Sequence, residues 1–198
     1  MRRGFAALLG AVLLVTSGCA MADRAGAAAI VDGDRYSAQE LADHFRELDA
    51  ALGNAEKPGT MDDVNRAIIG IVVADKIMDK VSAAQNLDVD MSEVAILREN
   101  LTKQLGGEEE MLAFAASRGV PPSLLDTVLK QSVFQTELGA KLIGGTDTDA
   151  QAEAALAYLQ DVAKSMQIEV SPRFGGWDAT QLVPVPPIDD LSKPALTQ

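Results

Sequence analysis

The stretch IVDGDRYSAQEL, residues 30–41, joins a short apolar strand, a tight turn and the beginning of a helix. Asp32-Gly33 is a dipeptide that favours the two-residue turn of a β-hairpin. Ser37 and Glu40 have the spacing of a capping box, in which each side chain accepts a hydrogen bond from the backbone amide of the other residue. The sequence therefore predicts a hairpin that runs directly into the first helix.

The chain between this hairpin and residue 168 has helical periodicity. Apolar residues recur at every third or fourth position in about six segments, which polar caps and glycines separate. The segment AIIGIVVA, residues 67–74, would by itself suit a buried strand, but the apolar pattern continues to Val81, and this length favours a central helix. We interpret Gly70 as a point of close packing against another helix; the alternative is a simple loss of helix propensity.

A second strand is expected late in the chain, where Ile168, Glu169 and Val170 alternate in polarity before Pro172. Two short strands far apart in sequence each need partners for their backbone groups, and pairing them would satisfy both. The sequence thus predicts a mainly α fold. A bundle of about six helices is closed by a small β element that pairs the hairpin, at about residues 29–36, with a strand at about residues 168–171.

Composition limits the possible partners. The chain has 198 residues, of which 47% are apolar, and this suits one globular domain with a core. The 17 Lys and Arg residues against 29 Asp and Glu give a formal net charge of −12. Because such a chain offers no basic patch to neutralise phosphates, we do not expect it to bind nucleic acid.

The first residues have the features of an export signal. Arg2 and Arg3 precede an apolar run, residues 5–15, that is too short to span a bilayer. Thr16-Ser17-Gly18 then leads into Cys19, the only cysteine, and this arrangement resembles a bacterial lipobox in which Cys19 is lipidated. The alternative is an ordinary signal peptide followed by an unrelated cysteine, and the arginine pair leaves both the Sec and the twin-arginine export routes open.

These observations predict four segments: a signal peptide at 1–18, a lipidated tether at 19–27, a folded body at 28–178 and a Pro-rich disordered tail at 179–198. The alternative for the tail is an irregular segment laid along the surface. Loss of residues 1–18, which hold two arginines and no acids, would change the net charge from −12 to −14. Anionic headgroups repel such a body, so we expect a protein held at the extracytoplasmic face of the cell membrane by its lipid alone.

Three motifs, in order, carry a family resemblance. They are Val31-Asp32-Gly33 before the cap Ser37, then Leu87, Val89, Ser92 and Glu93, and finally Pro172-Arg173-Phe174-Gly175. In this order they resemble the N-terminal chaperone domain of SurA-type folding factors, a peptide-binding domain related to those of PrsA and trigger factor. The likeness covers about residues 28–178. It implies an ATP-independent chaperone that binds unfolded or newly exported polypeptides, without a cofactor.

The resemblance also has a gap where full-length relatives insert a parvulin-type prolyl isomerase domain. Only about 25 residues separate the long helix from Ile168, whereas such a domain needs on the order of 90–100. With His44 as the only histidine, the paired imidazoles of a parvulin pocket cannot form. We therefore expect that this protein is not an enzyme. An adaptor or structural lipoprotein that binds one folded partner is the alternative function, and an isomerase-related protein is the third.

Single residues give few functional signals. His44 stands without a nucleophile or metal-ligand motif, so a surface or half-buried role is favoured over a catalytic one. Asp62, Asp63, Asp147 and Asp149 are interpreted as helix-cap residues rather than cation ligands, and no metal is expected. Two further interpretations concern apolar side chains: Met61, Met78, Met91 and Met111 fill the core rather than line a client surface, and Trp177 packs the last turn against the helices rather than binding a partner.

Overall fold

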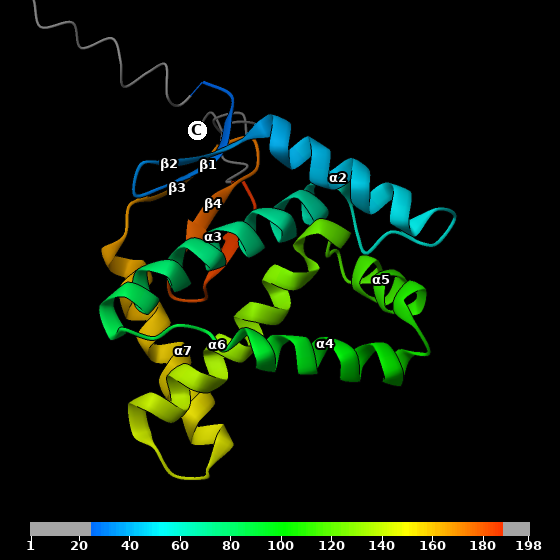
Figure 1. Ribbon diagram of the computed structural model, residues 1–198. Helices are drawn as coiled ribbons and strands as arrows, with labels where there is room; N and C mark the ends of the chain where they lie inside the picture. Colours follow the sequence, from blue (N-terminus) through cyan, green and yellow to red (C-terminus); the bar gives the residue numbers. More distant parts are fainter. Residues whose placement is uncertain (1–24, 188–198) are drawn as a thin grey trace, which may run out of the picture.

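The computed structural model describes residues 25–187 and is mainly helical, as the sequence predicts. Figure 1 shows the helices and strands in chain order, coloured along the sequence. The elements are β1 Ala27–Val31, β2 Asp34–Ser37, α2 Ala38–Leu52, α3 Met61–Gln85, α4 Met91–Leu105, α5 Glu108–Ser117, the 3-10 turn η1 Pro122–Leu124, α6 Leu125–Ile143, α7 Thr148–Ser165, β3 Ile168–Val170, β4 Gly176–Asp178 and β5 Val183–Val185.

The predicted hairpin and its capping box are both present. Asp32 and Gly33 have φ angles of 49° and 95°, the left-handed geometry that a tight hairpin turn requires. The Ser37 hydroxyl accepts a hydrogen bond from the Glu40 amide at 3.1 Å, and the Glu40 carboxylate accepts one from the Ser37 amide at 2.8 Å. The turn and the cap together fix the direction in which α2 leaves the sheet.

The pairing of the two distant strands is confirmed. β1 is the central strand of a three-stranded antiparallel sheet of order β2-β1-β3, with Ala29 opposite Val170 and Val31 opposite Ile168. The Asp32 amide also donates to the Gln167 carbonyl at 2.9 Å. We call these three strands the clasp, because they join the two ends of the helical body, as Figure 1 shows at the top of the molecule.

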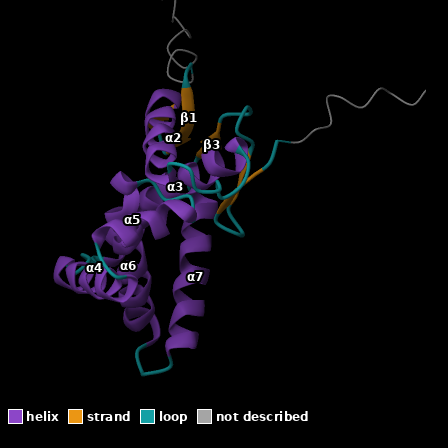
Figure 2. Cartoon of the chain, turned by 90° about the vertical axis from the view of Figure 1, so that its right-hand side faces the viewer, coloured by secondary structure: helices purple, strands orange, loops and turns teal. Residues whose placement is uncertain are grey.

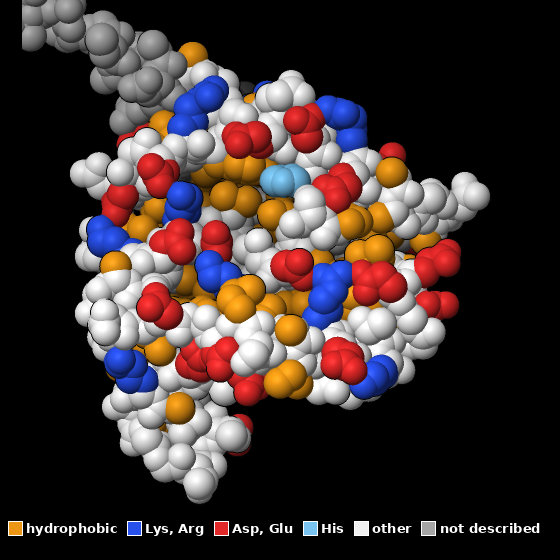
Figure 3. Space-filling model, viewed as in Figure 1, with side chains coloured by type: hydrophobic (Ala, Val, Ile, Leu, Met, Phe, Trp, Pro, Cys, Tyr) orange, Lys and Arg blue, Asp and Glu red, His pale blue; other side chains and the backbone are white. Residues whose placement is uncertain are grey.

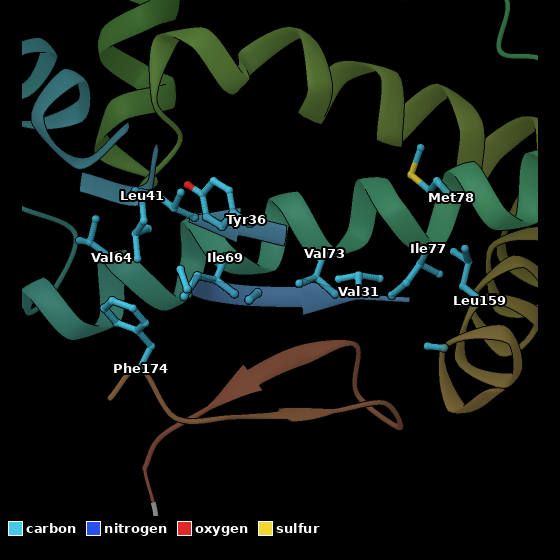
Figure 4. Packing of buried hydrophobic residues seen from close by; sticks show 14 of the residues in the cluster. Val31, Tyr36, Leu41, Val64, Ile69, Val73, Ile77, Met78, Leu159 and Phe174 are labelled. Carbon is cyan, nitrogen blue, oxygen red and sulfur yellow. The ribbon is translucent and has the colours of Figure 1, made fainter. Parts of the chain in front are cut away.

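Helix α3 runs through the centre of the main core. Its residues 67–74, which alone could suit a strand, lie inside a 25-residue helix that begins with a second capping box between Thr60 and Asp63. Ile68, Ile69 and Val73 are completely buried. The helix that carries them contacts β1, α2, α6, α7 and β5. Figure 4 shows this helix enclosed by apolar side chains from the clasp, from α7 and from Phe174.

A second, smaller core lies beside the first. Its buried members come from α4, α5 and the first half of α6, and Figure 2 shows α4 and α5 on one side of α6 with α7 on the other. Helix α6 therefore serves both cores, because Phe134 faces the main core while Leu129 faces the second one. The buried members of the second core are Val94, Met111, Ala115, Leu125 and Leu129.

The structure corrects the prediction of a disordered tail from residue 179. Residues 179–187 continue the folded body, because Val183–Val185 forms β5 and pairs with β4, with Pro184 opposite Trp177. A two-stranded sheet has only edge strands, so a proline there interrupts no central ladder. Gly175, at φ 119°, allows β5 to approach closely, because a Cβ there would lie 3.0 Å from the carbonyl carbon of Val185. The rest of the predicted tail, 188–198, lies outside the described residues.

Gly70 does allow close packing of α3, but its neighbour differs from the helix expected from the sequence. A Cβ at Gly70 would lie 3.2 Å from Cδ of Pro184, so the close neighbour of this glycine is strand β5 and not another helix. The glycine that does bring two helices together is Gly139 of α6. A Cβ there would lie 2.7 Å from the carbonyl carbon of Gln151 on α7.

Candidate functional site

A groove of about 430 Å³ lies between α4 and α6, at the open end of the second core. Helix α4 uses its Val94 side for burial, and this turns Ile96 toward solvent, where 49% of its surface is exposed. Ile96, Leu97 and Val133 form the apolar part of the lining. Leu97 and Val133 are also partly buried members of the second core, so the floor of the groove is continuous with packed structure.

The remaining lining is polar. Asn100 comes from α4, and Ser132 and Thr136 come from α6. The Thr136 hydroxyl donates to the Ser132 carbonyl at 3.2 Å, so this hydroxyl proton is already used within the helix. Ser132 and Thr136 follow Leu125 and Leu129 at helical spacing, and the structure places both in the wall of the groove.

Two carboxylates stand in the groove, Glu93 on α4 and Glu137 on α6. The Glu137 carboxylate accepts a hydrogen bond from the Asp90 amide at 3.2 Å, which fixes its position. Hydrogen bonds from the Ser92 hydroxyl and amide lower the pKa of Asp90 below its usual range, and Asp90 therefore stays charged beside Glu137. No Lys or Arg lines this groove.

A second groove, of about 300 Å³, lies between α3, the segment before α4, and α6. Its apolar lining includes Met78, Met91 and Phe134. Lys130 stands in it, with its ammonium 3.6 Å from Asp75 and 3.8 Å from Asp79. Asp79 and Asp88 also line this groove, so it differs from the first groove in containing a cation among its carboxylates.

A third hollow, of about 370 Å³, lies between the hairpin and α3 and includes Tyr36 and the ion pair of Lys76 with Asp34 at 2.8 Å. The Tyr36 hydroxyl is hydrogen-bonded to Nδ1 of His44 at 2.7 Å, and burial raises the pKa of Tyr36. Figure 3 shows His44 as the pale blue side chain beside exposed apolar atoms. This half-buried, hydrogen-bonded histidine fits the structural role that the sequence favoured.

Two of the four acidic residues considered as ligands, Asp63 and Asp147, form helix caps, and Asp62 and Asp149 lie in the first turns of the same helices. Asp63 completes the capping box of α3, and Asp147 accepts hydrogen bonds from the amides of Asp149 and Ala150 at 3.1 Å and 3.0 Å. Within residues 25–187, no three His, Cys, Asp or Glu side chains converge in a way that could hold a metal ion. Cys19, the predicted lipidation site, lies outside the described residues, and its modification stays a prediction.

The methionines divide into two pairs. Met78 and Met111 are buried, which confirms core filling for these two. Met61 and Met91 are 61% and 59% exposed, so the prediction was wrong for them, because each is the first residue of its helix and projects beyond the packed face. Trp177 packs partly buried against the main core, in agreement with the packing role predicted for it.

The sequence interpretation missed the groove residues Ile96, Val133, Glu93 and Glu137. One signal was available: Ile96 stands next to Leu97, so the apolar stripe of this helix is wider than one core needs. The sequence alone could not show that Glu93 and Glu137 line the same groove, because this depends on how α4 and α6 cross.

Comparison with family models, with curated proteins and with solved structures gives no match in any of the three. Among the helices within residues 25–187, none combines the length and the apolar character needed to cross a bilayer.

Proposed function

We propose that this chain is a membrane-anchored, extracytoplasmic, ATP-independent chaperone-like lipoprotein that binds unfolded or newly exported polypeptides. The observation that supports the proposal best is the α4–α6 groove, where Ile96 is half exposed within an apolar lining. Exposed apolar surface in a groove with a polar rim is typical of sites that bind other chains. The proposal assigns no catalytic residue and no cofactor.

The size of the groove suits weak and reversible binding. Removal of apolar surface from water contributes roughly 25 cal/mol per Å², and ordering a flexible client offsets part of this gain. A groove of about 430 Å³ has room for only a few side chains, and so it would release a client without an energy source. Release without nucleotide is what a holding chaperone outside the cytoplasm requires.

The sequence adds three supporting features. The motif order resembles the SurA-type chaperone domain, the residues before Cys19 resemble a lipobox, and the net charge of −12 favours solubility of a complex with an apolar client. A lipid at Cys19 would keep the body at the membrane surface, where exported chains emerge.

The proposal is tested by aggregation of several unrelated reduced proteins with residues 20–198 of this chain, which omit the predicted lipidation site. We expect suppression at near-stoichiometric ratio. The variant Ile96→Ser should lose most of this suppression, because it removes apolar surface from the groove. Its matched control is Leu156→Ser, since Leu156 on α7 is 47% exposed but lies outside the groove.

Three other outcomes would contradict the proposal. Equal loss in both variants would mean that general surface hydrophobicity, not the groove, holds the clients. No suppression of any client, together with capture of one folded partner, would favour the adaptor function instead. Catalytic turnover in a proline-limited refolding assay would favour an isomerase-related activity.

A further inference from the structure

The charges around the α4–α6 groove are all of one sign. Glu93 and Glu137 belong to opposite walls, with the apolar side chains of Ile96, Leu97 and Val133 between the two helices. Asp90, whose amide binds Glu137, adds a third negative charge at the same end of α4. A segment that enters the groove therefore meets carboxylates from two helices.

Three of the four Lys and Arg residues of these two helices pair with carboxylates outside the groove. On α4, Arg98 pairs with Glu108 and Asp126, and Lys103 pairs with Glu99. On α6, Lys130 faces Asp75 and Asp79 of α3, and the Lys141 ammonium donates to the Asn86 carbonyl at 3.4 Å. None of these four cations forms an ion pair with Glu93 or Glu137, the two carboxylates that line the groove.

The two further hollows described above differ in this respect. The hollow beneath the hairpin includes Arg35 and Lys76, and the groove beside Met91 includes Lys130. Each of these therefore combines both signs of charge, whereas the lining of the α4–α6 groove combines apolar atoms with carboxylates alone. A ligand matched to this groove needs an apolar side chain next to positive charge.

We infer that the α4–α6 groove selects polypeptide segments in which an aliphatic side chain is flanked by Lys or Arg. The inference rests on the proposed function and names its client class. The aliphatic side chain contacts Ile96 and Leu97, while flanking cations reach Glu93 and Glu137. Acidic segments are rejected twice, by the carboxylates of the groove and by the net charge of −12.

The test uses three fluorescein-labelled peptides with the same leucine-rich centre, flanked by lysines, by serines or by glutamates. Their affinities for residues 20–198 of this chain are measured by fluorescence anisotropy at low ionic strength. We expect the lysine peptide to bind roughly 3- to 10-fold more tightly than the serine peptide, as exposed ion pairs allow, and the glutamate peptide to bind most weakly. About 0.5 M salt should remove most of the difference.

The double variant Glu93→Gln with Glu137→Gln tests whether the groove is the source of the preference. A glutamine at 137 keeps an oxygen that can accept from the Asp90 amide, so α4 stays in place. We expect the affinities of the three peptides to approach one another. Glu56→Gln, in the loop between α2 and α3, removes one exposed charge outside the groove and should leave the preference intact.

The outcomes separate the inference from the function on which it rests. If the wild-type chain binds all three peptides equally, the client class is wrong while peptide binding stands. If no peptide binds, the proposed function fails and takes the inference with it. Circular dichroism checks that the double variant is folded. If the folded double variant keeps the full preference for the lysine peptide, the charge of the whole chain and not the groove is responsible, and the inference is overturned.

Discussion

The two cores of this protein are built from similar residues but differ in how completely they are enclosed. In the main core, α3 is surrounded by the clasp, α2, α6 and α7, and several of its side chains have no exposed surface. In the second core, the buried residues are flanked by partly exposed leucines, among them Leu97, Leu101 and Leu105. The comparison indicates that the main core stabilises the fold, whereas the second core leaves apolar surface available.

Helix α6 explains how one chain can contain both an enclosed core and a partly exposed one. Its Phe134 side is sealed within the main core, and its Leu129 side supports α4 and α5. A groove wall must hold its shape while remaining in contact with water, and a helix with one side anchored in an enclosed core provides this. Local opening is expected first in α4 and α5, which have fewer fully buried contacts.

The largest expected effect comes from Phe134→Ala. Phe134 is completely buried, and the loss of a large core side chain costs about 3–5 kcal/mol of unfolding free energy, measured by urea denaturation with circular dichroism. Leu129→Ala, in the second core, should cost less, about 2–3 kcal/mol, because its surroundings can collapse or admit water. An equal loss from both variants would show that the second core is as rigid and closed as the first.

Next in size is Gly139→Ala. The added Cβ would lie 2.7 Å from the carbonyl carbon of Gln151, so α6 and α7 must separate, and such overpacking costs about 1–3 kcal/mol. The matched variant is Gly70→Ala, where the added Cβ meets the Pro184 ring at 3.2 Å and strand β5 can give way. Because alanine favours a helix by about 1 kcal/mol over glycine, Gly70→Ala should be nearly neutral.

The stability of both glycine variants is measured by the midpoint temperature of thermal unfolding. A large loss at Gly70 together with a neutral result at Gly139 would contradict the packing just described. It would place the critical contact of the main core between α3 and the last hairpin instead of between α6 and α7.

The caps of α2 and α4 provide the next comparison. Ser37→Ala removes the hydroxyl that accepts from the Glu40 amide, and we expect a loss of about 1 kcal/mol in global stability. Asp90→Ala removes the equivalent cap of α4, which accepts from the Ser92 amide at 2.8 Å. Here the effect should be faster amide hydrogen exchange confined to α4. Uniformly faster exchange throughout the chain in Asp90→Ala would mean that the second core unfolds only with the first.

The parts of the fold that could be predicted are those with a local cause. The turn at Asp32-Gly33, the box of Ser37 with Glu40 and the periodicity of α3 each depend on residues within one or two turns of chain. The clasp was also predictable, because two isolated short strands left few other partners for their backbone groups. Such signals survive in a single sequence, since they do not depend on how the helices cross.

The parts that could not be predicted depend on the crossing of distant elements. The prolines after residue 179 indicate irregular chain, and only the approach of Val185 to Gly175 shows that a hairpin forms there. Likewise, Ser132 and Thr136 continue the core-facing stripe of α6 by spacing, but the angle between α4 and α6 leaves them in a groove. Spacing indicates which face of a helix a residue occupies, and not what covers that face.

The smallest expected effect concerns the clasp at low pH. The Lys80 ammonium donates to the Asp32 carboxylate at 2.5 Å, the Gln167 amide donates to it at 2.8 Å, and both bonds lower the pKa of Asp32. A carboxyl group with a lowered pKa in the folded state stabilises the fold above its unfolded pKa, about 3.9 for Asp. This contribution is then lost as the pH falls through the lower, folded value.

Asp32→Asn should therefore remove the part of the pH dependence that this carboxylate supplies. The pair is partly exposed, so the loss near neutral pH should stay below about 1 kcal/mol. Asparagine tolerates the left-handed φ of 49° and can still accept from the Gln167 amide, so the hairpin turn is kept. Unfolding free energies measured from about pH 6 to pH 2 check this, with Lys80→Ala as the partner variant in a double-mutant cycle. Parallel curves of unfolding free energy against pH for the wild type and Asp32→Asn would mean that the clasp is held by its backbone pairing alone. The ion pair of Asp32 with Lys80 would then contribute nothing to stability.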